Sequence, residues 1–199
     1  MLELAYYLGY KAAIVIGLAG SLDYQHTTPV SPLRLMKTLY LLRHAKSSWD
    51  DPDLKDFERP LSDRGISDIP LMAERFLQRH DGVACIICSP ALRAKTTAKL
   101  MAQNINFPVD DIVSNPELYF AGSGMFLKAA RLVDENCASA MLVGHNPAIT
   151  EFASVMAGIE IDNVPTCGLV ELRLPIEHWS EVEAGAAELV NFDYPKKEV

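Results

Sequence analysis

Two short segments of the chain contain residue types that could bind and transfer a phosphoryl group. Arg43 and His44 directly follow the apolar run 38–42, and His145 closely follows the apolar run 140–143. Guanidinium groups bind phosphoryl oxygens with paired hydrogen bonds, and a neutral imidazole can attack phosphorus. These residue types therefore indicate nucleophilic phosphoryl transfer.

A third apolar run, 83–88, leads into Ser89-Pro90 and then Arg93. Short apolar runs bounded by polar and turn residues are typical of buried strands. In an open α/β sheet, ligands bind just beyond the carboxyl ends of the strands. We therefore expect the polar residues after all three runs to meet at one edge of a sheet.

Three motifs, in this order, resemble the histidine phosphatase superfamily: Leu42-Arg43-His44-Ala45, Ser89-Pro90-Ala91-Leu92-Arg93-Ala94 and Gly144-His145-Asn146-Pro147. Three further stretches are similar to its small SixA-type phosphohistidine phosphatase branch: Arg43-His44-Ala45-Lys46-Ser47-Ser48-Trp49, Arg59-Pro60-Leu61-Ser62 and Pro116-Glu117-Leu118-Tyr119. The resemblance covers about residues 36–195. It implies a phosphoglycerate mutase-like fold and a metal-independent phosphatase, with no cofactor.

The resemblance implies a role for each residue of the first three motifs. His44, oriented by a hydrogen bond to one ring nitrogen, is the expected nucleophile and forms a phosphohistidine with the other. Arg43, Arg93 and His145 are expected to stabilise charge on the transferring oxygens. The residues expected to bind the phosphoryl group are Arg43, Ser89, Arg93, His145 and Asn146.

The sequence leaves more than one role possible for two further residues, Arg59 and Glu117. Arg59 lies in a motif that the resemblance places beside the site, so it is a candidate phosphate ligand; the alternative is an ion pair with the acidic run 50–56. Glu117 is the candidate general acid by its position in the motif, with Asp50 and Asp53 as the other candidates. A phosphohistidine substrate needs such an acid less, because imidazole leaves easily.

The alternation of apolar runs with helical periodicity predicts an α/β fold, a three-layer α/β/α sandwich. Helical spacing predicts four helices: after Ser62, from Pro90 to about Asn104, within 125–135, and from Pro147 to Gly158. Ser89 and Asn146 are the expected N-caps of the second and the fourth. Pro70 predicts a kink or a restart in the first.

The last two strands are expected at 168–174 and 187–192, where apolar and polar residues alternate. The link between them is too short for a crossover helix, so they should pair antiparallel. The sheet is therefore expected to be mostly parallel with an antiparallel edge.

Residues 36–199 are expected to form the histidine phosphatase domain, and residues 1–35 an N-terminal extension or linker. The stretch 4–19 is apolar, but Lys11 interrupts it and it is shorter than the roughly 20 residues of a membrane helix. Glu3 stands where a signal peptide would be basic. We expect a functional start at Met36 or a loosely attached extension, and a cytoplasmic protein that does not bind membranes.

The net charge of −8 argues against a nucleic-acid partner, which would require a basic surface. Phosphoglycerate mutase relatives carry added segments over the site, whereas the stretch before His145 is compact. An open pocket suits a phosphoryl group on a protein, such as a histidine-phosphorylated signalling protein. The alternatives are a small phosphomonoester as substrate, or a non-catalytic phosphate-binding module.

The four cysteines are expected to be small apolar residues or idle thiols, consistent with a reducing compartment. Cys85 and Cys88 have a CxxC spacing, but they lie in one predicted strand. Residues three apart on a strand point to opposite faces, so the two cannot readily bind one metal ion. Cys137 and Cys167 have no partner nearby in sequence.

Overall fold

The structure is a computed structural model that describes residues 36–120 and 122–197. The expectations for residues 1–35, including the extension and its apolar stretch, lie outside the described residues. Within the described ranges, no helix is long and apolar enough to cross a membrane.

A six-stranded sheet forms the centre of the domain. Its strands are β1 (Lys37–Arg43), β2 (Cys85–Cys88), β3 (Val113–Ser114), β4 (Ser139–Gly144), β5 (Leu169–Leu174) and β6 (Glu188–Asp193), in the order β3-β2-β4-β1-β5-β6. The pairs β1/β4, β2/β4 and β2/β3 are parallel, and β1/β5 and β5/β6 are antiparallel. The predicted mostly parallel sheet with an antiparallel edge is confirmed.

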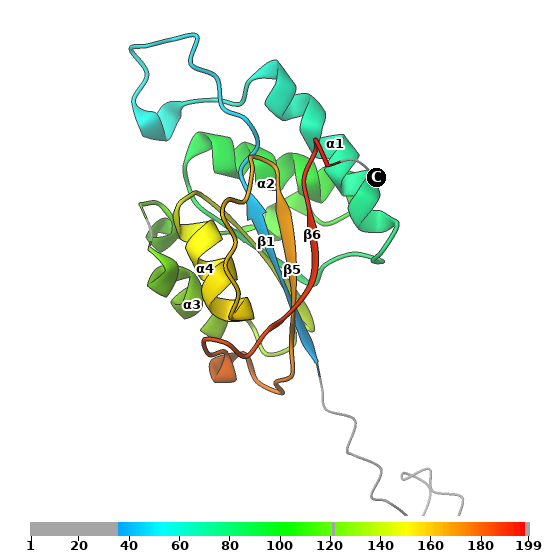
Figure 1. Ribbon diagram of the computed structural model, residues 1–199. Coiled ribbons are helices and arrows are strands. Elements are labelled where there is room, and N and C mark those ends of the chain that lie inside the picture. The colour runs from blue at the N-terminus through cyan, green and yellow to red at the C-terminus, as the bar shows by residue number, and fades with distance from the viewer. Residues whose placement is uncertain (1–35, 121, 198–199) are drawn as a thin grey trace, which may run out of the picture. The chain divides into compact units, whose positions relative to one another are not determined.

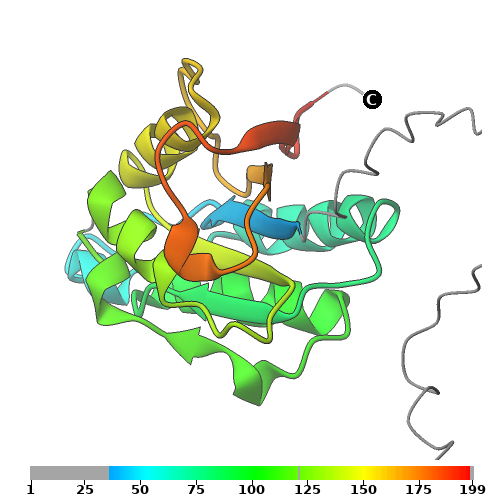
Figure 2. The ribbon, with the colours of Figure 1, turned by 90° about the horizontal axis from the view of Figure 1, so that it is seen from below.

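Four α-helices cover the two faces of the sheet, which makes three layers. Helices α1 (Asp63–Leu77) and α2 (Leu92–Asn104) lie on one face, and α3 (Ser123–Arg131) and α4 (Ala148–Ala157) on the other (Figure 1). Four short 3-10 turns lie in the segments that connect helices and strands: η1 (Asp56–Glu58), η2 (Val109–Asp111), η3 (Pro116–Leu118) and η4 (Trp179–Glu181). The view from below looks at the edge where β1 begins, with η4 in orange (Figure 2).

Alternate residues of the central strands supply two apolar cores, one on each face of the sheet. Leu39 and Leu41 of β1 pack with α3 and α4, while Tyr40 and Leu42 pack with α1 and α2. This alternation follows from the two-residue period of a strand. It leaves β1 buried on both faces, so its carboxyl end is held rigidly.

The start of α1 is held against the loop that follows β1 by hydrogen bonds and a close backbone contact. Ser62 caps the helix by accepting a hydrogen bond from Gly65 N at 3.2 Å, as predicted, and it also donates to Lys46 O at 3.1 Å. A Cβ on Gly65 would lie 2.2 Å from that same Lys46 oxygen, so only glycine permits this approach. The helix continues through Pro70 as one element.

The two predicted caps at Ser89 and Asn146 are wrong. Helix α2 begins only at Leu92 and α4 at Ala148, so the N-cap positions are occupied by Ala91 and Pro147, which make no side-chain capping bond. Ser89 is instead hydrogen-bonded to a histidine of the site described below, and Asn146 accepts a bond from Thr150 Oγ1 at 3.0 Å. Contacts with distant residues also engage both side chains: Ser89 pairs with a histidine 56 residues away, and Asn146 Nδ2 donates to Asn163 Oδ1 and Val164 O.

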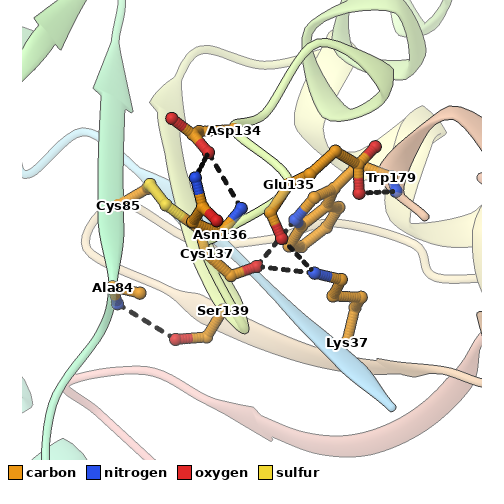
Figure 3. Close-up of a disulfide and its surroundings, with 9 residues drawn as sticks. All are labelled: Lys37, Ala84, Cys85, Asp134, Glu135, Asn136, Cys137, Ser139 and Trp179. Atoms are coloured by element: carbon orange, nitrogen blue, oxygen red, sulfur yellow. Dashed lines mark hydrogen bonds between the residues drawn. A yellow bond between two sulfur atoms is a disulfide. The ribbon is translucent and has the colours of Figure 1, made fainter. Parts of the chain in front are cut away.

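The expectation of four free thiols is also wrong, because Cys85 and Cys137 form a disulfide, with Cα atoms 6.2 Å apart (Figure 3). Cys85 begins β2, and Cys137 precedes the neighbouring strand β4. This pairing depends on strand order, which the spacing of cysteines does not reveal. Cys88 and Cys167 are free and buried, and Cys88 points to the opposite face from Cys85, as predicted.

Two buried side chains donate hydrogen bonds to main-chain carbonyl groups next to the disulfide. Trp179 Nε1 donates to Cys137 O at 2.8 Å, and Lys37 Nζ donates to Glu135 O at 2.8 Å and to Cys137 O at 3.0 Å (Figure 3). These contacts lie at the edge where β1 and β4 begin, opposite the edge where the site residues gather.

Candidate active site

His44 lies immediately after β1 and is 8% exposed. Its Nδ1–H donates to Ala45 O at 2.8 Å, and its backbone N donates to Gly144 O at 3.0 Å. Because the Nδ1 bond is to a carbonyl, Nδ1 carries the proton and Nε2 is unprotonated, with its lone pair able to accept a hydrogen bond or attack an electrophile. Burial lowers the pKa of His44 to about 3, and the nearby charges of Arg93 and Arg43 act in the same direction. The imidazole is therefore neutral, as a nucleophile must be.

Arg93, in the first turn of α2, lies against the unprotonated nitrogen of His44. Its Nε donates to His44 Nε2 at 3.4 Å. Thr97, one turn further on, donates to Arg93 O at 2.7 Å and accepts from Ala45 N at 3.0 Å. Thr97 thus joins α2 to the residue that orients His44, a contact that sequence reasoning missed.

His145 follows β4, and its ring centre lies 5.0 Å from that of His44. A hydrogen bond of 2.8 Å links its Nε2 to Ser89 Oγ. Burial lowers its pKa to about 4, with a further contribution from Arg93, so His145 is neutral rather than cationic at neutral pH. Its Nδ1 has no hydrogen-bond partner among the described residues. Ser89 is fully buried, and so it positions His145.

Arg43 and Asn146 share one pair of acceptors on the segment before β5. Arg43 Nη1 donates to Val164 O at 2.8 Å and to Asn163 Oδ1 at 3.3 Å. Asn146 Nδ2 donates to the same two atoms, at 3.2 and 2.9 Å. Arg43 Nε is buried and makes no hydrogen bond within the described part of the chain, so it remains available as a donor.

Asp56 is the site residue that sequence analysis overlooked, because it was only one carboxylate of an acidic run. Its Oδ2 accepts from Arg93 Nη2 at 2.9 Å and from Tyr119 Oη at 3.1 Å, and its Oδ1 lies 3.4 Å from Arg59 Nη1. Burial by itself raises the pKa of Asp56, but the hydrogen bonds from Arg93 and Tyr119 outweigh it, and the net pKa is lowered. Asp56 is therefore an anion held between two arginines.

Arg59 forms the ion pair that was one of its two expected roles. Besides Asp56, it binds Ser47 Oγ at 2.8 Å and Ser48 O at 3.2 Å, and its guanidinium stacks 3.2 Å from the ring centre of Trp49. Arg59 is 8% exposed and is linked to Arg93 through Asp56. A direct contact with phosphate stays a prediction.

Glu117 lies in η3 and forms an ion pair with Lys128 of α3 at 2.6 Å. Tyr119, two residues later, reaches the site: its ring lies 5.9 Å from that of His145. Asp50, another candidate acid, accepts a hydrogen bond from Ser48 at 2.7 Å, and Asp53 is exposed. Proton donation by any of the three stays a prediction.

The arrangement favours an anionic ligand. Two guanidinium groups, a buried neutral histidine whose unprotonated nitrogen faces one of them, and a second neutral histidine converge beyond the ends of β1, β2 and β4. Within the ranges that the structure describes, no group of three or more His, Cys, Asp or Glu side chains could hold a metal ion. The chemistry available to these residues is attack by His44 on an electrophile that the arginines hold.

Comparison with known proteins agrees with this geometry. The family model of the histidine phosphatase superfamily (branch 1) matches residues 39–118. An uncharacterized protein of Mycobacterium tuberculosis is 32% identical over 165 residues, which are 78% of this chain and all of that protein. An uncharacterized chloroplastic protein of Arabidopsis thaliana is 31% identical over 158 residues, covering 75% of this chain and 72% of that protein.

Solved structures are similar as well. A candidate phosphohistidine phosphatase SixA from Agrobacterium tumefaciens is 30% identical, with a TM-score of 0.67 over 80% of this chain and 98% of that one. The protein histidine phosphatase SixA complexed with tungstate has the same fold, with a TM-score of 0.68, 22% identity, and coverage of 79% of this chain and 97% of that one. The chain belongs to the histidine phosphatase superfamily. Within it the chain is SixA-like, and it is a phosphatase.

Proposed function

We propose that the protein hydrolyses phosphohistidine on a protein substrate, through a phosphohistidine intermediate on His44. The observation that supports this most strongly is the hydrogen bond from His44 Nδ1 to Ala45 O, which leaves Nε2 unprotonated, with its lone pair facing Arg93 Nε. A fixed tautomer with the lone pair next to a phosphate-binding guanidinium is what in-line attack requires.

The first step forms a bond between His44 Nε2 and phosphorus and breaks the P–N bond of the substrate phosphohistidine, which is protonated on its other ring nitrogen and therefore leaves as neutral imidazole. In the second step, water attacks the phosphoryl-His44 and releases inorganic phosphate and free His44. Arg93, Arg43 and His145 stabilise the charge on the phosphoryl oxygens in both steps.

The surroundings of two carboxylates, Asp56 and Glu117, favour phosphohistidine over an alkyl phosphate. Asp56 is held as an anion by Arg93 and Tyr119, and Glu117 is engaged in an ion pair with Lys128. An alkoxide leaving group depends strongly on a proton donor, whereas an imidazole leaving group depends on one much less. A small phosphomonoester remains the alternative substrate.

A panel of substrates tests the proposal. Purified protein should release phosphate from free phosphohistidine and histidine-phosphorylated peptides with a much higher kcat/KM than from alkyl phosphates. His44→Ala should remove this activity without changing the melting temperature, and acid-labile label should be trapped on His44 of the native protein. Faster turnover of alkyl phosphates would overturn the substrate class, and label trapped on another residue would overturn the nucleophile.

A further inference from the structure

Three exposed aromatic side chains border the site. Trp49, Phe57 and Phe120 are 72%, 41% and 83% exposed, and they are the only exposed Trp and Phe residues of ranges 36–120 and 122–197. Trp49 covers Arg59, and the other two flank Tyr119. Exposed aromatic residues gathered at one place are typical of surfaces that bind another molecule.

Two of these residues form an aromatic row that begins at the catalytic histidines. Tyr119 lies 5.9 Å from His145, Phe120 lies 4.0 Å from Tyr119, and Phe57 packs edge-on against Tyr119 at 5.0 Å, all between ring centres. The row therefore connects the phosphoryl site with η1.

Beyond Phe57, the row opens into a cavity of about 600 Å³. Its walls are mainly apolar and include Phe57, Leu92, Val109 and Ile112. A cavity of this size is large enough for a whole side chain or a small ligand.

Two lysines give the cavity a local positive charge. Lys95 and Lys99 lie one turn apart on α2 and line the cavity with one carboxylate, Glu58. The chain as a whole has a net charge of −8, so this pair differs in sign from the average surface. The chemistry that fits is an apolar group with an acidic group beside it.

The cavity and the phosphoryl site share two walls. Where β2 leads into α2, Ser89 and Arg93 contact the two histidines, while Leu92 between them lines the cavity. In η1, Asp56 binds Arg93, and Phe57 lines the cavity. A substrate held by its phosphoryl group at Arg93 is therefore next to the cavity.

We propose that the cavity binds an apolar side chain of the protein substrate, and that Lys95 and Lys99 bind a carboxylate adjacent to that side chain. The inference rests on the proposed function and deepens it, since it specifies which protein segments the enzyme accepts. A phosphoryl group is recognised by the arginines alone, whereas the aromatic row and the cavity contact parts of the substrate that only an extended chain supplies. Phe120 and Phe57 pack against that chain between the two sites.

Histidine-phosphorylated peptides test this proposal by reversing the charge of the two lysines and, separately, the charge of the peptide residue that they would bind. One peptide series places a Leu-Glu pair at graded spacings from the phosphohistidine, and matched series carry Leu-Lys or Ala-Gln. The double variant Lys95→Glu/Lys99→Glu should lower kcat/KM for the best Leu-Glu peptide about 10-fold or more, which corresponds to about 1.4 kcal/mol. It should raise kcat/KM for the Leu-Lys peptide and leave turnover of free phosphohistidine unchanged.

A second variant and a matched control complete the experiment. Phe120→Ser should lower kcat/KM for all the peptides but not for free phosphohistidine. Because the Phe120 side chain is 83% exposed, its replacement should leave the melting temperature unchanged. Lys196→Glu/Lys197→Glu makes the same charge change beyond β6, at the other edge of the sheet from β3, and should change neither activity.

The outcomes separate this inference from the proposed function. The inference alone would be overturned if the native protein had equal kcat/KM for the Leu-Glu and Ala-Gln peptides. It would also be overturned if the double variant did not lower kcat/KM for Leu-Glu and raise it for Leu-Lys. A further contrary result is that the double variant loses as much activity on a small apolar phosphate ester as on the peptides. That result would assign the cavity to small molecules and would also overturn the inference. Absence of turnover of free phosphohistidine and of every peptide by the native protein would overturn the proposed function together with the inference.

Discussion

Arg93 Nε lies 3.4 Å from His44 Nε2, the ring nitrogen that has no proton. This places a fixed cation beside the lone pair that attacks phosphorus in the proposed mechanism, and it also disfavours protonation of His44. In that mechanism, a phosphoryl group bound by Arg93 lies next to the nucleophile before any bond forms. Binding and attack would then depend on the same pair of residues.

Arg43 and Arg93 should both be needed to bind tetrahedral or trigonal-bipyramidal anions. Arg93→Ala and Arg43→Ala should each weaken vanadate inhibition about 10-fold or more, because each removes a charge-assisted pair of hydrogen bonds. Arg→Lys should restore little, since an ammonium group lacks the forked geometry. Arg64→Ala is a suitable control, because Arg64 is half-exposed and pairs with Asp68. Unchanged inhibition constants in both alanine variants would contradict the assignment.

Asp56→Asn should separate binding from turnover. The carboxylate orients Arg93 but also repels an incoming anion, so its neutralisation should tighten vanadate binding and lower kcat by roughly 10-fold, the loss of one charged hydrogen bond. Asp53→Asn makes the same charge change in the same acidic run at an exposed position and should affect neither. Parallel losses of vanadate binding and kcat in Asp56→Asn would show instead that Asp56 only maintains the local fold.

Glu117 should matter in proportion to the basicity of the leaving group. If Glu117 leaves its ion pair with Lys128 and protonates the leaving group, Glu117→Gln should cut kcat on an alkyl phosphate by ~10²-fold, within the usual range for general acid catalysis. With phosphohistidine the loss should be much smaller. Lys128→Met removes the ion-pair partner and controls for the effect of breaking that contact. Equal losses of kcat on both substrates would make Glu117 a structural residue and leave the proton donor unidentified.

Stability should fall as the pH is lowered from about 6.5 towards 4. The folded protein holds the pKa of His44 at about 3 and that of His145 at about 4, whereas an unfolded histidine titrates near 6.5. Between these values the unfolded chain binds more protons, so each histidine removes up to about 1.4 kcal/mol of unfolding free energy per pH unit. Urea unfolding at pH 5 and 7 measures the change, and His145→Asn should reduce it. An equal slope in this variant would refute the buried neutral state of His145.

The disulfide should support stability without affecting catalysis. Cys85 and Cys137 are 52 residues apart in sequence, and closing a loop of that length stabilises by about 4 kcal/mol on a chain-entropy basis. Cys85→Ala/Cys137→Ala should therefore unfold at a lower urea concentration, with kcat/KM unchanged because the bond lies at the opposite edge of the sheet. Thiol labelling of the denatured, non-reduced protein should find only two of the four cysteines. Labelling of all four would show that the bond does not form.

The sequence by itself determined the strands that end at the site, because these depend on local patterns. β1 and β4 are buried on both faces and appear as continuous apolar runs, and β5 and β6 could be paired from the shortness of their link. Arg43, His44 and His145 follow from that pattern, since a residue at the end of a strand has its position set by the strand itself.

Only the tertiary structure decided which distant side chains meet these residues. Asp56 could not be told from its neighbours in the acidic run until η1 was packed against α2, which brings it to Arg93, 37 residues away. Ser89 was predicted as a cap because capping is a local preference, but the fold offers it His145, 56 residues away, as a partner. Cys85 and Cys137 likewise pair because β2 and β4 are neighbours. In each case the deciding contact is between segments far apart in the chain, and its free energy exists only once the sheet has formed.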